Sequence, residues 1–177
     1  MLILTASSGK NLALAQSIAS SAKDQGLKTE IIDLCSLALP LYTTAQQQQG
    51  AGGGLDVLVE ALQRHQGVII CAPEYNGSIP PSLSNAIAWL SVTREDFREI
   101  FSHRPLALAS HSGGGGHRVL VAMRQQMAYL GCTVLGRELL ATSQKPVNPD
   151  SITAIVQSLH QLEQLKPAVD GGQAGTR

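Results

Sequence analysis

Five short apolar runs, each followed by a segment of helical periodicity, constrain the fold of this chain more than any other feature. The apolar runs span residues 2–5, 28–34, 67–72, 105–110 and 133–136. Apolar residues recur three or four positions apart over 12–22, 55–62, 83–90, 119–130 and 152–165. Such alternation predicts a parallel sheet with helices on both faces. Because crossovers are right-handed, the simplest arrangement is a doubly wound, five-stranded α/β sheet.

The length of 177 residues suits one domain with a core of ordinary size. We expect that domain to span residues 1–166 and residues 167–177 to form a flexible tail. A glutamine- and glycine-rich stretch at 43–54 falls within a strand-to-helix connection, and we predict that it is a mobile surface loop.

The charge balance disfavours two classes of partner. Thirteen basic and thirteen acidic residues give no net charge, so nothing draws the chain to nucleic acid or to an anionic membrane. The sequence contains no apolar stretch long enough to span a membrane, and its first apolar run is too short for a secretory signal. We therefore expect a cytoplasmic protein.

Three dispersed cysteines, Cys35, Cys71 and Cys132, form no C-x-x-C pair. This pattern argues against a disulfide framework and against a zinc site. We predict that each is a small buried residue in a reducing compartment.

Polar sequence follows three of the predicted strands, where ligands bind in open α/β sheets. The first such stretch, "TASSGKN" at 5–11, offers hydroxyl and amide groups, a glycine and Lys10 at the start of a helix. A helix N-terminus with these neighbours favours a phosphate. It lacks the Walker A spacing. An alternative that the sequence leaves open is that Ser8 or Asn11 only caps the helix.

The second stretch, "APEYNGSIPPSLSNAIAW" at 72–89, holds a polar turn between stiff points. Pro73 ends the strand, and Pro80 and Pro81 fix extended backbone before a helix whose first turn suits Pro81. A turn held in this way would suit recognition of a planar heterocycle through its backbone amides. An ordinary Asn-Gly turn at 76–77 would leave Pro73 and the Pro80-Pro81 pair unexplained.

The third stretch, "ASHSGGGGHR" at 109–118, has four glycines that let backbone N–H groups approach a ligand closely. A hydrolase interpretation of its Ser-His pair is weak because G-x-S-x-G is absent. A metal site at His111 and His117 lacks supporting ligand spacing. We predict that both are loop histidines with satisfied hydrogen bonds, with His111 beside a ligand, and that the chain holds no metal.

Together these stretches resemble a known family. Residues 73–89 look like the signature of the NADPH-dependent FMN reductases, which include chromate, quinone and azo-dye reductases. "LPLY" at 39–42 and the glycine-rich loop follow in the family's order, so the resemblance spans about residues 2–140. It implies a flavodoxin-like fold with strand order 2-1-3-4-5 and FMN at the carboxyl ends of the strands.

The resemblance also implies roles for individual residues. The FMN phosphate would lie on Ser7, Ser8, Lys10, Asn11 and Leu12. The flavin ring and ribityl chain would lie against Pro73, Glu74, Tyr75 and Asn76, with Ser78 close by. The other side of the flavin would face Ser110, His111, Gly113, Gly114 and Gly115.

The sequence departs from the family pattern at several of its positions. Lys10 stands where the family commonly has arginine. It would therefore bind phosphate as a point charge, without the paired N–H groups of a guanidinium. Ser84 and Ala88 replace a lysine and an aspartate on a helix that lies near the family's dimer interface. The resemblance nevertheless implies a homodimer or homotetramer.

The implied activity is ping-pong hydride transfer from NADPH or NADH to FMN, and then to a small acceptor such as a quinone, azo compound, chromate or free flavin. The cofactor supplies the chemistry, which fits a sequence with no convincing nucleophile–base pair. Tyr75 and His111 are the only candidates for a catalytic acid or base. Three alternatives remain: an electron carrier, which the neutral charge disfavours, a non-catalytic flavin- or nucleotide-binding regulator, and a hydrolase.

Overall fold

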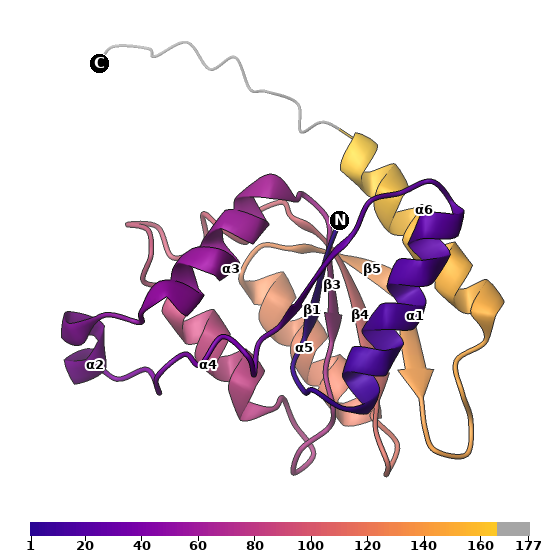
Figure 1. Cartoon of the computed structure of the whole chain (residues 1–177), viewed down its shortest axis with the longest axis horizontal. Coiled ribbons are helices and arrows are strands. Elements are labelled where there is room, and N and C mark those ends of the chain that lie inside the picture. The colour runs from indigo at the N-terminus through magenta and orange to yellow at the C-terminus, as the bar shows by residue number, and fades with distance from the viewer. Residues whose placement is uncertain (166–177) are drawn as a thin grey trace.

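The computed structural model describes residues 1–165, and the predicted tail at 167–177 lies outside them. One sheet contains five parallel strands in the order β2-β1-β3-β4-β5, as predicted. Figure 1 shows these strands running in the same direction, with helices packed around them. The strands are β1 (Leu2–Thr5), β2 (Glu30–Asp33), β3 (Val68–Cys71), β4 (Pro105–His111) and β5 (Thr133–Ala141). The helices are α1 (Lys10–Asp24), α2 (Thr44–Gln49), α3 (Gly53–Arg64), α4 (Pro81–Leu90), α5 (His117–Tyr129) and α6 (Pro149–Gln164).

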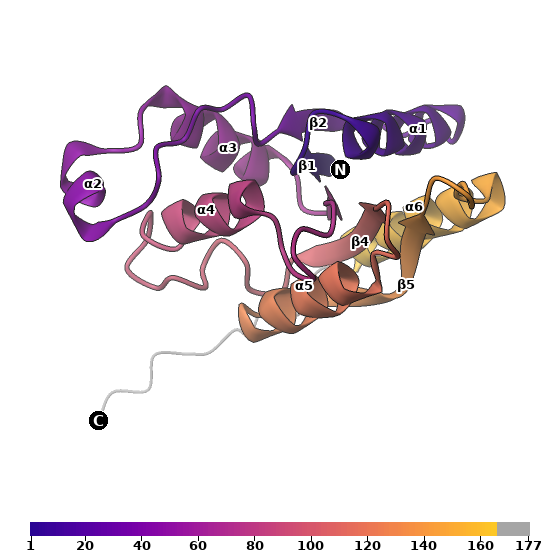
Figure 2. The same ribbon diagram turned by 90° about the horizontal axis from the view of Figure 1, so that it is seen from below.

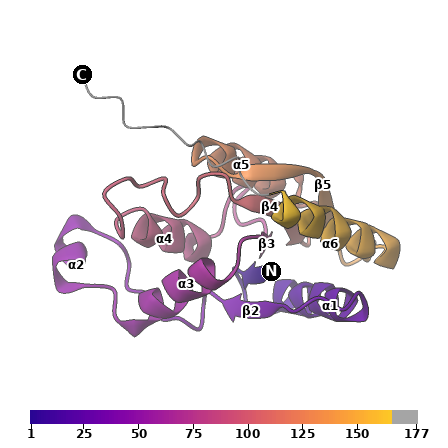
Figure 3. The same cartoon turned by 90° about the horizontal axis from the view of Figure 1, so that it is seen from above.

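Two apolar layers form the core, one on each face of the sheet. Because side chains alternate along a strand, Leu4 and Ile70 enter the layer beneath α3, α4 and α5. Ile3 and Ile69 enter the opposite layer, beneath α1 and α6. Figures 2 and 3 show this division, with α1 and α6 on one side of the molecule and α3 and α4 on the other. Burial on both faces explains why β1 and β3 are apolar except for Thr5 at the end of β1.

The fifth strand is longer than the predicted 133–136. Its pairing with β4 shifts, because Leu106 lies opposite Val134 whereas Leu108 lies opposite Glu138. The bulge lets β5 continue past the apolar run, through Gly136, Arg137 and Glu138, to Ala141. As a result, the carboxyl end of β5 reaches the same edge of the sheet as the end of β4.

The prediction of a loop at 43–54 was wrong. Residues 44–49 form α2, whose first turn is capped by Thr43 accepting a hydrogen bond from Gln46 N. Gly50, at a φ of 91°, ends the helix, and α3 begins at Gly53. Glutamine is a good helix former, so a cap was enough to order the run. Figure 1 shows α2 standing away from the body, and none of its residues is buried.

The segment before α2 is held by helix α4. The Asn85 side chain accepts a hydrogen bond from Tyr42 N at 2.8 Å and donates one to Pro40 O at 3.0 Å. Trp89 Nε1 also donates to Pro40 O, at 2.7 Å, and the Trp89 ring meets the Tyr42 ring edge-on. These contacts fix the connection between β2 and α3 beside the carboxyl edge of the sheet.

The cysteine prediction was partly wrong. Cys71 and Cys132 are buried, and burial raises the pKa of Cys71 to about 12 and that of Cys132 to about 11. Cys35 is exposed, because it follows β2 at the edge of the sheet instead of lying within the strand. Across residues 1–165, no helix is long and apolar enough to cross a membrane.

Candidate functional site at the carboxyl edge of the sheet

Three loops meet at the carboxyl edge of β1, β3 and β4, at the bottom of Figure 1. They are loop 1 (residues 6–9, leading into α1), loop 3 (72–80, leading into α4) and loop 4 (112–116, leading into α5). Since all three strands are parallel neighbours, their following loops share one side of the sheet.

Loop 1 presents unpaired backbone donors at the start of α1. Gly9 occupies the N-cap position, and no side chain caps the helix. In the described part of the chain, the backbone N–H groups of Ser8, Gly9 and Lys10 donate to no acceptor. The first turn of α1 has no acidic residue. The loop therefore offers positive ends of peptide dipoles to an anion.

Lys10 and Ser8 lie exposed at this helix end, Ser7 and Leu12 are partly buried, and Asn11 is buried. The Lys10 ammonium donates to Ser143 Oγ at 2.8 Å, across to the connection that follows β5. The lysine therefore places a positive charge at the same helix end as the unpaired N–H groups.

Asn11 joins loop 1 to the end of β4, and because no side chain caps α1, neither Asn11 nor Ser8 is the helix cap. Its Nδ2 donates to His111 O at 3.0 Å, and its Oδ1 accepts from His111 N at 2.8 Å. The side chain is 1% exposed. These paired bonds bridge residues one hundred positions apart, so the two loops are held at a fixed separation.

Loop 3 contains a tight hairpin turn at its tip. Tyr75 and Ser78 exchange backbone hydrogen bonds of 3.1 and 3.0 Å, and Asn76 and Gly77 have φ values of 52° and 75°. Positive φ at both central positions defines a type I′ turn, for which Asn-Gly is the preferred pair. The turn leaves the Tyr75 ring half exposed, with Asn76 and Ser78 exposed beside it.

Prolines hold both ends of this turn, as predicted. Pro73 is buried two residues after the end of β3, and Pro80 precedes α4 with extended backbone. Pro81 occupies the first turn of α4. Ser82 adds a bond from α4 to loop 1, because its Oγ donates to Ala6 O at 2.8 Å.

Glu74 ties loop 3 to loop 4. Its backbone N donates to Ser112 Oγ at 2.8 Å, and its carboxylate accepts from Arg118 N at 3.1 Å. The Arg118 guanidinium lies 3.8 Å from the same carboxylate. Because the Glu74 side chain is 14% exposed and that of Arg118 is 80% exposed, the ion pair faces solvent on its arginine side. The carboxylate also lies at the N-terminus of α5, where a negative charge is favoured.

Loop 4 contains one glycine that is closely packed, Gly116, and three glycines with open space around them. At Gly116, with φ of 76°, a Cβ atom would lie 2.6 Å from the Leu140 side chain. A Cβ at Gly113, Gly114 or Gly115 would meet no atom within 4 Å. The backbone of these three residues is therefore accessible to a ligand. Ser110, by contrast, is buried beneath the loop and shares a hydrogen bond of 2.9 Å with Ser112.

His111 differs from its prediction as a histidine with satisfied hydrogen bonds. Its Nδ1 is buried and has no partner in the described part of the chain. Alternation along β4 turns its ring toward α1 and α6, where it lines a cavity of about 300 Å³ with Lys10 and Ile152. His117 is exposed and is the first residue of α5, whereas His111 is the last residue of β4, so the prediction of two loop histidines was wrong. Within residues 1–165, no cluster of three or more His, Cys, Asp or Glu could hold a metal ion.

Sequence reasoning missed several residues that hold the three loops together. They are Ser82, Ser112, Gly116, Arg118 and Ser143. One signal was available: Ser110 and Ser112 are two residues apart after a strand, a spacing that puts side chains on one face. The partners of the others depend on how the loops cross in space.

The profile of the family described as "NADPH-dependent FMN reductase" matches residues 1–146. The chain belongs to this family. The match covers loops 1, 3 and 4 and all five strands, so the resemblance carried by residues 73–89 is confirmed.

Individual relatives agree with this assignment. The chain is 34% identical to a quinone reductase of Escherichia coli (strain K12) over 112 residues, which are 61% of this chain and 58% of that protein. It is 30% identical to an NADPH azoreductase of Bacillus sp. (strain OY1-2) over 115 residues, 63% of this chain and 60% of the other. The matched region thus spans about three fifths of each curated relative.

Solved structures support the flavodoxin-like fold. FerB, a flavoenzyme NAD(P)H:(acceptor) oxidoreductase of Paracoccus denitrificans, superposes with a TM-score of 0.71 at 18% identity, covering 92% of this chain and 96% of that one. A flavodoxin from the domain Archaea gives 0.60 at 13% identity, covering 90% and 99%. At these identities the likeness concerns the fold alone.

Proposed function

We propose that this protein is an FMN-dependent NAD(P)H oxidoreductase that passes electrons to a small acceptor, such as a quinone, an azo compound, chromate or free flavin. Family membership supports the cofactor and the reaction class. The observation that carries the proposal is the run of unpaired N–H groups at Ser8, Gly9 and Lys10, beside a proline-held turn and an open glycine loop.

The residues present fit FMN. The N–H groups of loop 1 and the Lys10 ammonium would hold its phosphate, and Ser7 and Ser8 add hydroxyl donors. The backbone of loop 3 from Pro73 to Ser78 would hold the edge of the flavin ring. Gly113, Gly114 and Gly115 would approach its other side, because no side chain blocks their backbone.

Bound FMN would accept a hydride from a reduced nicotinamide and then reduce an acceptor that takes the nicotinamide's place. The protein's own residues bind and orient the two rings. Asn11 and Glu74 fix the spacing of the loops, and the half-exposed Tyr75 ring borders an open edge that a second ring can reach.

Tyr75 is the better of the two acid–base candidates. Its side chain is solvent-exposed at the loop 3 turn, whereas the His111 ring lies toward α1 and α6. We include in the proposal a cytoplasmic homodimer or homotetramer that acts on small molecules, without nucleic acid or membrane partners. The balanced charge of the chain supports the last point.

The proposal is tested with the purified protein and FMN under anaerobic conditions. We expect NADPH or NADH to bleach the flavin absorbance, and a quinone to restore it. If FMN binds but neither NADPH nor NADH bleaches it, the proposal is contradicted, and a non-catalytic flavin-binding regulator becomes the better interpretation. Two well-separated one-electron potentials, with slow bleaching by nucleotide, would indicate an electron carrier.

A further inference from the structure

A second cavity lies at the opposite, amino edge of the sheet. Its volume is about 480 Å³, within the range of roughly 300–1,000 Å³ typical of small-molecule sites. The end of α3, the connection before β4, the start of β5 and the end of α6 surround it. Leu62, Ile100 and Leu162 give it apolar walls, and Arg104 and Thr133 also line it.

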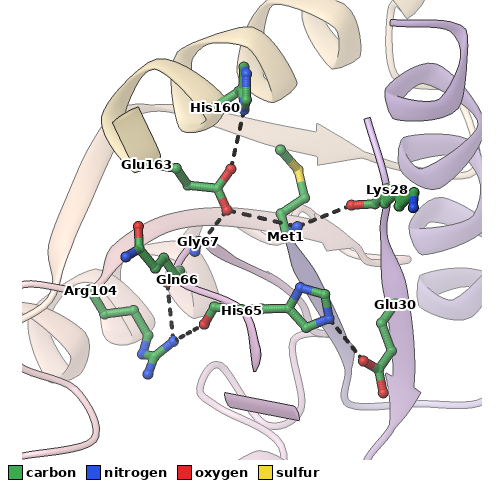
Figure 4. A network of polar contacts seen from close by, with 9 residues as sticks. All are labelled: Met1, Lys28, Glu30, His65, Gln66, Gly67, Arg104, His160 and Glu163. Atoms are coloured by element: carbon green, nitrogen blue, oxygen red, sulfur yellow. Dashed lines mark hydrogen bonds and ion pairs between the residues drawn. The ribbon is translucent and has the colours of Figure 1, made fainter. Parts of the chain in front are cut away.

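Arg104 is a mostly buried cation in the wall of this cavity. Its Nε donates to Ile100 O at 2.8 Å, and its Nη1 donates to His65 O at 2.6 Å and to Gln66 O at 3.1 Å. Figure 4 shows the guanidinium reaching the last two carbonyls. Within residues 1–165 no carboxylate lies within ion-pair distance, and Nη2 donates to no acceptor.

The charge of Arg104 is therefore only partly compensated. Neutral carbonyls orient a guanidinium but do not neutralise it, and a buried charge without a counter-ion is costly. Burial accordingly lowers the pKa of Arg104 from its ordinary value. An anion entering the cavity would supply the missing charge.

The nearby carboxylates already have partners. Glu30 pairs with Arg64 and with the His65 ring, each at 2.9 Å. Glu163 accepts from Gly67 N at 2.9 Å and lies 3.8 Å from the amino group of Met1, as Figure 4 shows.

The carboxylate of Glu99 also lines the cavity, but it lies 3.3 Å from the Arg94 guanidinium. The other polar residues of the lining carry no fixed charge: Gln63, His65, Gln66, Ser102 and His103. Arg104 is the single arginine or lysine in the described lining, and with Glu99 close by the cavity suits a ligand with one negative charge.

We propose that this cavity binds a small organic monocarboxylate. Its carboxylate accepts a charge-assisted hydrogen bond from Arg104 Nη2, the guanidinium nitrogen that donates to no carbonyl. Its apolar body packs against Leu62, Ile100 and Leu162. The cavity lies at the amino ends of the strands, whereas loops 1, 3 and 4 lie at their carboxyl ends, so it is separate from the proposed FMN site.

Calorimetric titration of the full chain loaded with FMN tests the proposal, with benzoate and hexanoate as probes and benzamide as a neutral analogue of benzoate. We expect one benzoate or hexanoate to bind per chain. Benzamide should bind at least about tenfold more weakly than benzoate, because it cannot neutralise the guanidinium. Inorganic phosphate should also bind at least about tenfold more weakly than benzoate. Failure of both carboxylates to bind, or equal binding of benzamide or phosphate, would overturn the proposal.

Variants locate the site. Arg104→Gln should weaken benzoate binding at least about tenfold. Because this change also removes bonds to three carbonyls, Thr133→Trp provides an independent test: it narrows the cavity from an exposed position and leaves Arg104 intact. Arg137→Gln, an exposed arginine of β5 outside the lining, is the matched control and should bind as the parent does. Unchanged benzoate binding in a folded Arg104→Gln or Thr133→Trp variant would overturn the assignment.

Discussion

Replacing Asn11 by alanine should separate loop 1 from the end of β4. The side chain is 1% exposed and makes hydrogen bonds of 3.0 and 2.8 Å to the backbone of His111. Truncation leaves one N–H and one C=O group of His111 without their partner, and each such group costs about 1–3 kcal/mol when buried. His111 is partly buried, so we expect a loss of about 2–4 kcal/mol of unfolding free energy in total.

For a chain of this size, that loss corresponds to a melting temperature lower by about 5–15 °C. Thermal unfolding of the apoprotein, followed by circular dichroism, measures it. Gln16→Ala is the matched control, because Gln16 is exposed on the same helix, and it should change stability by less than about 0.5 kcal/mol. FMN affinity should fall in Asn11→Ala, since the bridged loops contribute to the proposed phosphate and ring sites. An Asn11→Ala protein as stable as the Gln16→Ala control would refute the reasoning.

Three further predictions concern backbone strain, thiol reactivity and acid stability. Gly116→Ala should lower the free energy of unfolding by about 2–3 kcal/mol, because a clash with Leu140 adds to the cost of about 1–2 kcal/mol for a positive φ. Gly113→Ala should lower it far less, because a Cβ atom there meets open space. If the two differ by less than about 0.5 kcal/mol in urea unfolding, the packing of loop 4 is not as described. Native protein at about pH 8 should take up one maleimide, on Cys35, because burial raises the other two thiol pKa values to about 12 and about 11; mass spectrometry showing a second label on native protein would contradict this. A hydrogen bond from His65 lowers the pKa of Glu30, so ionised Glu30 stabilises the fold above its unfolded pKa, and that contribution is lost as the pH falls through the folded pKa. Stability should therefore fall less in Glu30→Gln than in the parent as the pH drops from about 6 to about 3, and an equal fall in both would count against the interaction.

The sequence predicts the strand order and the shared edge of the three loops because both follow from general rules. Short apolar runs such as 67–72 that alternate with helical segments are typical of strands buried on both faces of a parallel sheet, and right-handed crossovers then limit the topology. The roles of Pro73 and Pro81 could also be predicted, since the proline ring fixes the backbone φ angle wherever proline stands.

Features that depend on side-chain partners could not be read in this way. Asn11 resembled a helix cap, and only the approach of β4 shows that it binds His111 instead. Helix α2 depends on a cap at Thr43, a weak local signal within a glutamine-rich run. Arg104 follows a charged stretch at 94–99 and belongs to no motif, and its missing counter-ion becomes visible only when the surrounding carboxylates are placed.

The most direct test of the central claim compares FMN with riboflavin, which lacks the phosphate, in fluorescence titrations of the apoprotein. If the N–H groups of Ser8, Gly9 and Lys10 hold the phosphate, FMN should bind one per chain, at least about tenfold more tightly than riboflavin, and the difference should shrink at high salt. Equal affinity for the two flavins, or no binding of FMN, would contradict the account.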